Sequence, residues 1–209
     1  MMRAEPGTMN DSTLPELVSP LDHTIPDVKL VRPRVHGDAR GYFMETYNQG
    51  AYARAGISDD FVQDNQSRSE NAGTVRGLHF QTPPFAQAKL VRCTHGRMLD
   101  IAVDIRVGSP TYGRHVGVEL SAENAWQLYI PVGFAHGFVT LVPGTVIQYK
   151  VSAGYSAAHD AGILWNDPAL DIAWPVAAGA AILSDKDKRM PRLADYPSPF
   201  RYQPPQPSD

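Results

Sequence analysis

The alternation of apolar and polar side chains over residues 98–106 constrains the fold of this chain more than any other feature. In MLDIAVDIR, every second position from Leu99 to Ile105 holds a large aliphatic residue, while Asp100 and Asp104 fall on the other face. Successive side chains of a β-strand point to opposite faces, so the pattern predicts a strand with one buried and one exposed face. Further short apolar stretches, each bounded by Gly, Pro, Asn or Ser, predict strands at residues 116–120, 126–131, 138–142 and 146–151. Short strands at this spacing favour an antiparallel sandwich or barrel.

The composition supports a chain with many turns. It contains 17 glycines and 18 prolines among 209 residues, a share above the usual value of about 12%. One short helix is predicted at 49–55, where Asn48 is a suitable N-cap and Gly56 suits the position after the last turn. We interpret the chain as one domain with two extensions: a flexible polar segment at 1–22, the domain at 23–190 and a Pro-rich tail at 191–209. The tail is expected to lie across the surface or to fray.

Charge and cysteine content exclude several classes of protein. The formal net charge of −3 disfavours a general nucleic-acid binder but is compatible with a small anionic ligand. The single cysteine, Cys93, excludes an intrachain disulfide and a metal site built from thiolates. No run of about 18 apolar residues is present, and the polar N-terminus lacks the apolar segment of a secretory signal. We therefore expect a cytoplasmic protein with no membrane span.

The segment RGLHFQ, residues 76–81, is the first candidate for chemistry. His79 is either a structural histidine of the core or a general base, because its side chain changes charge near neutral pH. In a regular strand Arg76 and His79 point to opposite faces, but a bulge at Gly77 would turn both toward one side. The seven histidines form no HxH, HExxH or Cys/His cluster, so we expect no metal site.

Four other positions leave structural and functional interpretations open. Lys89, just before an apolar strand, is either a solvated residue or a group that polarises a carbonyl or binds phosphate. Tyr149 shares a face with Ile147, so it is either a core tyrosine or a proton donor. Residues 61–69 (FVQDNQSRS) form either a surface loop or a hydrogen-bonding edge for a sugar or nucleotide. SDKD, residues 184–187, either caps a turn or supplies a carboxylate that orients a histidine.

Considered together, the segments of this chain resemble the dTDP-4-dehydrorhamnose 3,5-epimerase family in both order and spacing. The segments that carry the resemblance are GDARGYFMETYN (37–48), FVQDNQSRS (61–69), TVRGLHFQ (74–81), QAKLVRCTHGRMLDIAVDIRVGSPTYGRH (87–115), LSAENAWQLYIPVGFAHGFVTL (120–141), YKVSAGY (149–155), ILWNDPALDIAWP (163–175) and LSDKD (183–187). The resemblance extends from about residue 25 to 192, roughly four-fifths of the chain. It implies an all-β, cupin-like double-stranded β-helix jelly roll with a few short helices and extended termini, which forms a homodimer.

The resemblance also implies a reaction. Members of the family invert C3 and C5 of dTDP-4-dehydro-6-deoxy-D-glucose to give dTDP-4-dehydro-L-rhamnose, without a metal or redox cofactor. Both protons lie next to the C4 ketone, so removing either gives an enolate. Such a site requires a base, a group that stabilises the enolate oxygen and an acid on the opposite face. By motif position, His79 resembles the base, Asp187 its orienting partner, Lys89 the group near the C4 oxygen and Tyr149 the acid, at least at C5.

Ten further residues match binding positions of the family. They are Arg40, Glu45, Gln63, Asp64, Asn65, Arg76, His136, Tyr155, Asp160 and Lys186. Arg40 and Arg76 resemble substrate and diphosphate contacts, and Tyr155 resembles the surface that stacks on thymine. Part of this set is expected to come from the neighbouring subunit. Departures from the family pattern are Gln66 in place of His, Ala88 in place of Gly and Asp160 in place of Glu.

Three alternatives stay open at this point. A single-carbon epimerase, acting at C3 or C5 of a related 4-keto nucleotide sugar, differs only in the stereochemistry of its product. A non-catalytic cupin that binds a sugar nucleotide is disfavoured because both His79 and Tyr149 are present. A metal-dependent cupin oxygenase is weaker still, because no ligand set exists. We therefore predict a cofactor-independent isomerase whose partner is a dTDP-linked 4-keto-6-deoxy sugar, with no nucleic-acid or membrane partner.

Overall fold

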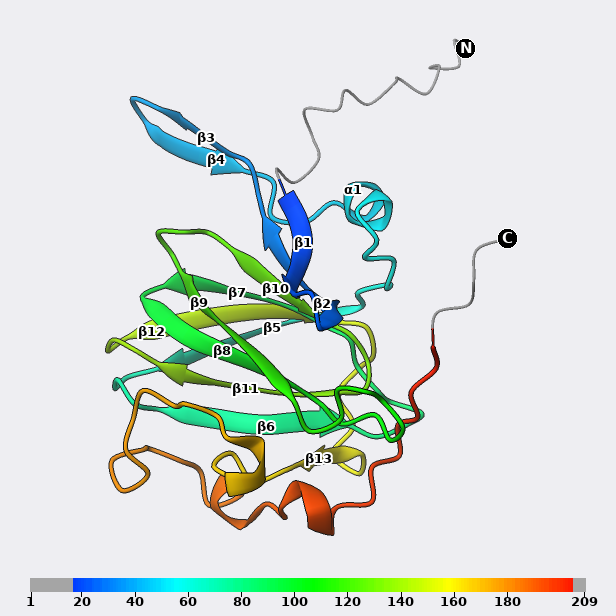
Figure 1. The fold of residues 1–209 in the computed structure, drawn as a ribbon. Helices are drawn as coiled ribbons and strands as arrows, with labels where there is room; N and C mark the ends of the chain where they lie inside the picture. Colours follow the sequence, from blue (N-terminus) through cyan, green and yellow to red (C-terminus); the bar gives the residue numbers. More distant parts are fainter. Residues whose placement is uncertain (1–16, 205–209) are drawn as a thin grey trace.

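Two antiparallel β-sheets packed face to face form the body of this computed structural model, which describes residues 17–204 (Figure 1). The six-stranded sheet has the order β1 (Leu17–Asp22), β2 (Ile25–Arg32), β10 (Gln127–Ile130), β7 (Lys89–His95), β12 (Thr145–Val151) and β5 (Gln63–Ser69). The five-stranded sheet has the order β13 (Asp160–Gly162), β6 (Val75–Gln81), β11 (Phe134–Thr140), β8 (Arg97–Asp104) and β9 (His115–Ser121). A separate hairpin consists of β3 (Val35–Asp38) and β4 (Gly41–Met44). The prediction of an all-β antiparallel sandwich is confirmed.

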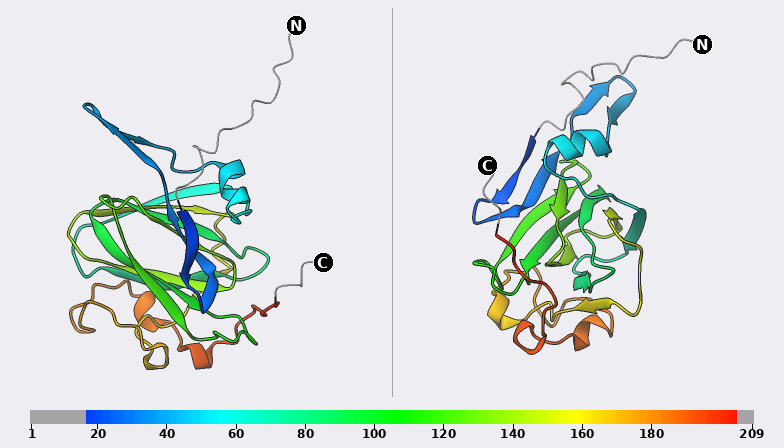
Figure 2. Two further views of the ribbon diagram at one scale, coloured as in Figure 1. Left: turned by 45° about the horizontal axis from the view of Figure 1, so that its top comes forward. Right: turned by 90° about the vertical axis from the view of Figure 1, so that its right-hand side faces the viewer.

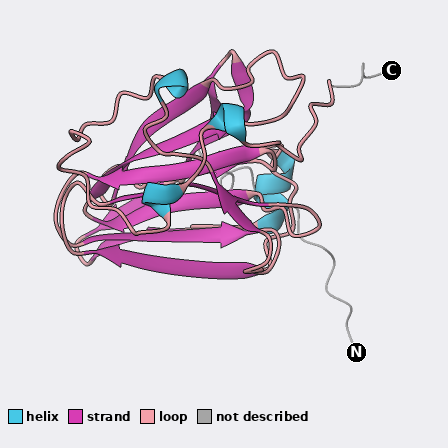
Figure 3. Cartoon of the chain, turned by 90° about the horizontal axis from the view of Figure 1, so that it is seen from below, coloured by secondary structure: helices cyan, strands magenta, loops and turns pink. Residues whose placement is uncertain are grey.

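Helices are few and short in the described part of the chain (Figure 3). Helix α1 (Gln49–Arg54) begins after Asn48, whose side-chain Oδ1 accepts a hydrogen bond from the backbone N–H of Ala51 at 3.1 Å. Gly56 follows the helix with a φ of +81°, so the predicted cap and stop are confirmed. The 3₁₀ helices near the C-terminus are η2 (Pro168–Leu170), η3 (Asp187–Arg189) and η4 (Leu193–Asp195). None of the helices within residues 17–204 is long and apolar enough to cross a membrane.

The main hydrophobic core lies between the two sheets. Val91, Leu128 and Ile147 of the six-stranded sheet pack there with Met98 and Phe138 of the five-stranded sheet. All five side chains are buried, which is the outcome expected for strands that turn one apolar face toward a facing sheet. The strands predicted by apolar stretches correspond to β9, β10, β11 and β12, although β11 begins earlier than predicted, at Phe134.

The surroundings of the two faces of strand β8 differ from the prediction, which gave one buried and one exposed face. Its aliphatic face, which includes Ile101, packs outward against the C-terminal segment and contacts the second core around Leu193. Its other face points between the sheets, where Ala102 belongs to the main core. Asp100 and Asp104 lie on that face and are 0% exposed. The expectation of an exposed polar face was therefore wrong, because the C-terminal segment covers one side of β8 and the six-stranded sheet covers the other.

Both ends of the described chain are held by specific contacts. Residues 17–22, predicted as the end of a flexible extension, form β1 and pair with β2. In the tail, Phe200 is buried in the second core and Arg201 forms a bridge with Val107. The tail crosses the surface, one of the two predicted outcomes, and these contacts fix its described part (Figure 2). The remainder of the predicted N-terminal extension and the end of the tail lie outside the described residues.

The polar segment at residues 61–69 forms a sheet edge. Strand β5 pairs along its whole length with β12, with Asn65 opposite Tyr149. Because successive side chains alternate, Ser67 points toward the space between the sheets while Asp64 points to the outer face, where it binds Lys150. The interpretation of this segment as a surface loop was wrong, because residues 63–69 form an edge strand. The alternative, a hydrogen-bonding edge for a sugar or nucleotide, stays a prediction.

A bulge in β6 turns Arg76 and His79 to the same side of the sheet. In the pairing of β6 with β11, the three steps from Arg76 to His79 match only two steps over residues 136–138. Gly77 has a φ of +137°, and a Cβ there would lie 2.5 Å from the Cα of Gly137. Only glycine tolerates both the backbone angle and the close approach. The predicted bulge at Gly77 is confirmed.

The β3–β4 hairpin extends away from the sandwich, as both Figure 1 and Figure 2 show. Tyr42 and Phe43 on this hairpin are 68% and 72% exposed, and Val35 is also exposed. Large apolar side chains grouped on one projecting element are typical of a surface that binds a partner.

Candidate active site

A cavity of about 460 Å³ opens between the sheets where β6 and β11 face β7 and β12. Residues 182–187, which lead into η3, complete its wall. The cavity brings together four residues predicted for catalysis and three predicted for binding: His79, Lys89, Tyr149 and Asp187, with Arg76, His136 and Lys186. Its volume is within the range of about 300–1,000 Å³ that is usual for small-molecule sites.

His79 and Asp187 form a hydrogen-bonded pair at this cavity. The Nε2 atom of His79 lies 2.5 Å from Oδ1 of Asp187, and Asp187 is only 2% exposed. Burial raises the pKa of Asp187, but hydrogen bonds from His79 and Ser184 and the nearby positive charges outweigh burial and hold that pKa below its usual value. An ionised carboxylate only accepts hydrogen bonds, so Nε2 carries a hydrogen and Nδ1 is left with a free lone pair. The pair has the arrangement of a base with its orienting carboxylate.

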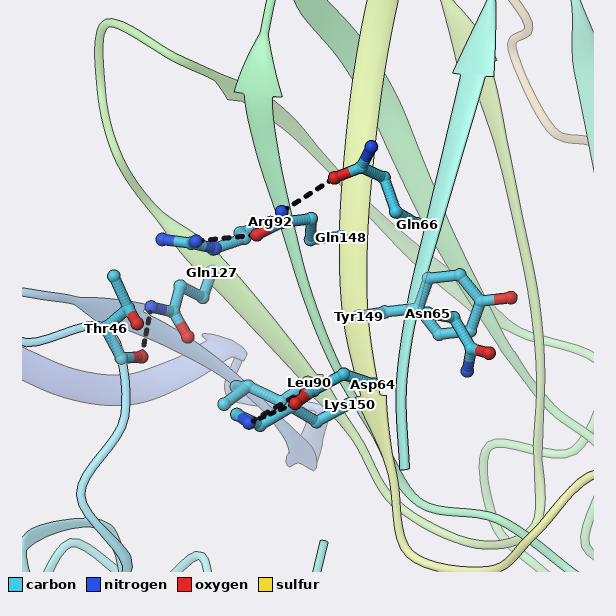
Figure 4. Close-up of a pocket in the computed structure, with 10 residues that line it drawn as sticks. All are labelled: Thr46, Asp64, Asn65, Gln66, Leu90, Arg92, Gln127, Gln148, Tyr149 and Lys150. Carbon is cyan, nitrogen blue, oxygen red and sulfur yellow. Dashed lines mark hydrogen bonds and ion pairs between the residues drawn. The ribbon is translucent and has the colours of Figure 1, made fainter. Parts of the chain in front are cut away.

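Tyr149 enters the cavity from the opposite sheet. It belongs to β12, whereas His79 belongs to β6. Figure 4 shows its ring beside Asn65, on the other side of the strand from Gln148. Burial raises the pKa of the Tyr149 phenol, and the charge of Asp160 acts in the same direction against that of Arg76. The hydroxyl therefore keeps its proton at neutral pH and can serve as an acid.

Lys89 is the buried cation of the cavity. Its Nζ donates a hydrogen bond to the backbone oxygen of His79 at 3.3 Å. Burial lowers the pKa of Lys89 to about 8, although the charges of Asp100 and Asp160 act to raise it. An ammonium group with a pKa near neutral can stabilise a developing oxyanion and can also give up a proton.

His136 forms a second histidine–carboxylate pair, with Asp100. The two residues lie on adjacent strands, β11 and β8, and Nε2 of His136 is 2.7 Å from Oδ1 of Asp100. Burial lowers the pKa of His136, so the ring is neutral near pH 7, although Asp100 opposes this effect. Sequence reasoning missed Asp100 because the alternation of β8 assigned it to an exposed face. It also missed Ser67, whose buried hydroxyl lines the same cavity without a hydrogen-bond partner in the described part of the chain.

A chain of polar side chains runs beside the cavity and contains further predicted binding residues. The ammonium group of Lys186 contacts Oδ2 of Asp160, which also accepts a hydrogen bond from the hydroxyl of Tyr155 at 3.2 Å. The backbone N–H of Tyr155 donates to Oε1 of Gln63 at 3.2 Å, and Gln63 in turn donates to Oδ1 of Asn65 at 2.8 Å. These five residues come from β5, β13 and two loops, so folding alone brings them together.

Three predicted binding residues do not reach the cavity of their own chain. Arg40 lies at the end of the β3–β4 hairpin and pairs with Asp38. Glu45 follows β4 and accepts a hydrogen bond from Asn48 at 3.3 Å. Asp64 lies on the outer face of β5, away from the space between the sheets. The lining of the cavity includes none of these three residues.

A second cavity, of about 330 Å³, lies on the outer face of the six-stranded sheet (Figure 4). There Arg92 donates to Gln148 at 2.7 Å, and Gln148 donates to Gln66 at 2.8 Å. Gln66, one departure from the family pattern, therefore lines this second cavity and not the first, although Tyr149 borders both. Across residues 17–204, no group of three or more His, Cys, Asp or Glu side chains is arranged to hold a metal ion.

Comparisons with known proteins identify the family of this chain. The model of the family described as dTDP-4-dehydrorhamnose 3,5-epimerase matches residues 22–195. A curated relative with that name from Sinorhizobium fredii is 55% identical over 179 residues, which cover 86% of this chain and 91% of the relative. The crystal structure of the Legionella pneumophila dTDP-6-deoxy-D-glucose-3,5-epimerase in complex with dTDP-4-keto-L-rhamnose has a TM-score of 0.84 and 41% identity, covering 90% of this chain and 98% of that one.

A second solved structure gives the same result. The dTDP-4-dehydrorhamnose 3,5-epimerase of Bacillus anthracis, with TDP and pyrophosphate bound, has a TM-score of 0.80 and 49% identity, covering 84% of this chain and 99% of that one. The expected cupin-like jelly roll is confirmed by these neighbours together with the two antiparallel sheets described above. The chain belongs to the dTDP-4-dehydrorhamnose 3,5-epimerase family of isomerases.

Proposed function

We propose that this protein inverts C3 and C5 of dTDP-4-dehydro-6-deoxy-D-glucose to give dTDP-4-dehydro-L-rhamnose, the precursor of dTDP-L-rhamnose. One observation carries the proposal. His79 of one sheet, paired with Asp187 of η3, faces Tyr149 of the other sheet across a single cavity, with Lys89 in its wall. An epimerase that inverts a carbon needs a base and an acid on opposite faces of that carbon, and two facing sheets supply this arrangement.

In the proposed mechanism, Nδ1 of His79 removes the proton next to the C4 ketone. Asp187 holds the ring in the required tautomer and stabilises the imidazolium that forms. The charge that develops on the C4 oxygen is stabilised by the ammonium of Lys89, whose burial strengthens the interaction. Tyr149 then delivers a proton to the other face of the carbon, at least at C5. Exchange with solvent resets both His79 and Tyr149 after each inversion.

Substrate binding is assigned to charged and aromatic residues around the cavity. Arg76 and Lys186 are suited to the diphosphate, because guanidinium and ammonium groups bind phosphate oxygens. Tyr155 is 64% exposed and offers a flat surface for thymine. Gln63, Asn65 and Asp160 supply hydrogen bonds beside it. No metal or redox cofactor takes part in this scheme, since every step is a proton transfer.

We further propose that the enzyme is a homodimer in which each β3–β4 hairpin reaches the cavity of the partner. Two observations support this arrangement: the exposed aromatic residues Tyr42 and Phe43 on the hairpin, and the distance of Arg40 and Glu45 from the cavity of their own chain. The net charge of −3 and the lone, unpaired Cys93 fit a cytoplasmic enzyme without nucleic-acid partners.

Incubation with dTDP-4-dehydro-6-deoxy-D-glucose in D₂O tests the proposed reaction. We expect deuterium at both C3 and C5 by NMR and mass spectrometry, and dTDP-L-rhamnose once the 4-keto reductase is added. Label at one carbon alone would instead identify a single-carbon epimerase. Binding of the nucleotide sugar without any label would favour a different substrate or a binding role.

A further inference from the structure

Gln81, the last residue of β6, is a buried amide that the mechanism above does not use. It is 4% exposed and lies two residues after His79 on the same strand. Its Oε1 accepts a hydrogen bond from the backbone N–H of Ser156 at 2.7 Å. Its Nε2 donates to the backbone oxygens of Gly154 at 3.1 Å and Phe85 at 2.8 Å, which uses both amide hydrogens. Gln81 therefore binds the chain immediately before and immediately after Tyr155.

Tyr155 depends on such contacts because the segment that carries it is irregular. Residues 154–156 belong to the connection between β12 and β13 and lie outside both strands. The Tyr155 side chain is exposed, so packing against the core does little to fix the ring. A loop with few buried contacts opens more easily than the strands around it. The orientation of the ring therefore depends on how the backbone on each side of it is held.

The β12–β13 loop is also joined to the β6–β7 loop, to which the third hydrogen bond of Gln81 goes. The backbone N–H of Thr82 donates to the oxygen of His159 at 2.9 Å, and Nε2 of Gln87 donates to the oxygen of Ala153 at 2.7 Å. These two contacts lie at the ends of the paired loops, whereas Gln81 binds both loops in the middle. The two loops therefore form one unit that is attached to the end of β6 through a single buried side chain.

We propose that Gln81 is a positioning residue for nucleotide binding: its amide fixes the backbone on both sides of Tyr155, so that the ring is held ready to stack on thymine. The inference rests on the proposed function, because the stacking of thymine on Tyr155 is part of it. A ring that is already ordered in the free enzyme loses less conformational entropy on binding. Since Gln81 and His79 are two residues apart on β6, about 7 Å along the strand, the same strand positions the general base and the loop that binds the nucleobase.

Gln81→Met tests the proposal, because it removes all three hydrogen bonds and keeps a side chain of similar length. The Kd of dTDP, measured by titration calorimetry, should rise about tenfold, which is typical of the loss of one base stacked on one aromatic ring. The KM of the nucleotide sugar should rise by a similar factor, while kcat stays within about twofold of wild type, because the groups that transfer protons are unchanged. A purely structural role would lower kcat through loss of folded enzyme and leave KM as it is. That result, or an unchanged Kd, would overturn the proposal.

The matched control is Asn124→Leu, in the connection between β9 and β10. The Asn124 amide also binds three backbone groups: it accepts from the N–H groups of Ser121 and Trp126, each at 3.0 Å, and donates to the oxygen of Glu119 at 2.9 Å. None of these residues lines the catalytic cavity. Asn124→Leu should lower the melting temperature and keep the wild-type Kd of dTDP. An equal rise of Kd in both variants would show that the effect is not specific to the loop of Tyr155, and would overturn the proposal.

Pyrophosphate is the matched control ligand, because it has no nucleobase. Its inhibition constant should be the same for the wild-type enzyme and Gln81→Met, since the proposed role of Gln81 concerns the Tyr155 ring and not the diphosphate contacts. Equal losses of affinity for dTDP and for pyrophosphate would contradict this role.

A double variant tests whether Gln81 acts through Tyr155. Tyr155→Ala alone should raise the Kd of dTDP about tenfold. Adding Gln81→Met to Tyr155→Ala should change Kd little further, because the ring that Gln81 positions is already absent. Losses that multiply in the double variant would show that Gln81 acts by another route and would overturn the proposal.

Hydrogen exchange of the wild-type protein tests the contact without any substitution, and so does not depend on whether Gln81→Met folds. The Ser156 N–H should exchange slowly although it lies outside the strands, because Gln81 accepts its hydrogen bond. Rapid exchange there would overturn the proposal. A wild-type enzyme that binds no dTDP would contradict the proposed function and this inference with it. One that binds dTDP but incorporates no deuterium would contradict the reaction alone, and the Kd values would still decide the role of Gln81.

Discussion

His79 and His136 are neighbours across two strands, yet their surroundings prepare them for different tasks. They face each other in the pairing of β6 and β11, and each has one carboxylate partner. The side chain of His79 is 31% exposed, whereas that of His136 is 8% exposed. An open imidazole can take up and release protons, while an enclosed neutral imidazole is suited to holding one hydrogen-bond direction. At the residue scale, this difference in burial supports the proposal that His79 is the base.

Replacing His79 tests its role as the base. His79→Ala should abolish deuterium exchange at both C3 and C5 while the fold is kept, because one imidazole serves both carbons. Exchange is measured by NMR in D₂O, and the fold by far-UV circular dichroism. His95→Ala, an exposed histidine at the end of β7, is the matched control and should exchange normally. Near-normal turnover in His79→Ala would remove this residue from the mechanism.

Replacing Tyr149 separates the two carbons. Tyr149→Phe keeps the ring and removes only the proton that is delivered from the β12 side. We expect inversion at C5 to fall about 100-fold or more, in line with the usual contribution of a general acid. Proton exchange at C3 should fall less. Equal losses at both carbons would instead assign Tyr149 to substrate positioning, and product stereochemistry by NMR distinguishes these outcomes.

The exchange rate should also fall as the pH rises above about 8, the pKa of Lys89. Above that pH the ammonium loses its proton, and the enolate oxygen loses the positive charge that stabilises it. The sign follows from the protonated form being the active one. Deuterium exchange is stopped at fixed times and measured between pH 6 and 10, which gives the basic limb of the pH–rate profile. The Lys150→Met variant, changed on the outer face of the sheet, should keep the same basic limb. A rate that continues to rise to pH 10 would contradict the role of Lys89.

At the scale of elements, the positions of β8, β9, β10 and β12 were predictable, while the orientation of β8 was not. The alternation of apolar and polar residues in β8 correctly predicted a strand, because this pattern depends only on residues that are neighbours in the sequence. Which face turns inward depends on residues far along the chain: the C-terminal segment around Leu193 and Phe200 covers the aliphatic face. Asp100 was missed for this reason. The bulge at Gly77 was predictable, because two functional residues three positions apart need it to share a face.

Gly77→Ala tests the bulge. A methyl group there would meet Gly137 at 2.5 Å, and the φ of +137° is unfavourable for alanine. We expect the free energy of unfolding to fall by about 2 kcal/mol or more, as for a strained backbone position. Gly108→Ala is the matched control, because its φ is also positive but nothing lies within 4 Å of the added carbon. Equal losses in denaturant titrations of the two variants would show that the close approach to Gly137 is unimportant.

At the scale of the whole molecule, the cavity of one chain is lined by all the predicted acid and base groups but not by all the predicted binding groups. The resemblance to the family predicted that Arg40 and Glu45 bind substrate. The sequence alone could not show how far these two residues lie from the cavity. The structure shows both outside it, on or next to a projecting hairpin. The motifs therefore predicted residues that the fold gathers at one cavity, while the roles of Arg40 and Glu45 depend on the proposed dimer.

Mixing two inactive variants tests whether sites are shared between subunits. Arg40→Ala and His79→Ala chains, refolded together, should recover about a quarter of wild-type activity, because half of the dimers would contain one intact site of two. Each variant refolded alone is the control, and its activity should stay low. Dimer formation is checked by sedimentation. If the mixture is no more active than the separate variants, Arg40 serves its own chain or no site at all.

The position of Asp187 near the end of the chain means that it is synthesised after both sheets. His79 and Tyr149 leave the ribosome long before Asp187, and η3, which begins at Asp187, is followed by the segment that Leu193 and Phe200 anchor to the second core. A nascent chain can assemble both sheets while the base still lacks its carboxylate. Chains that end before residue 200 would therefore keep most of the sandwich but hold Asp187 loosely, so catalytic competence is acquired at the last stage of translation.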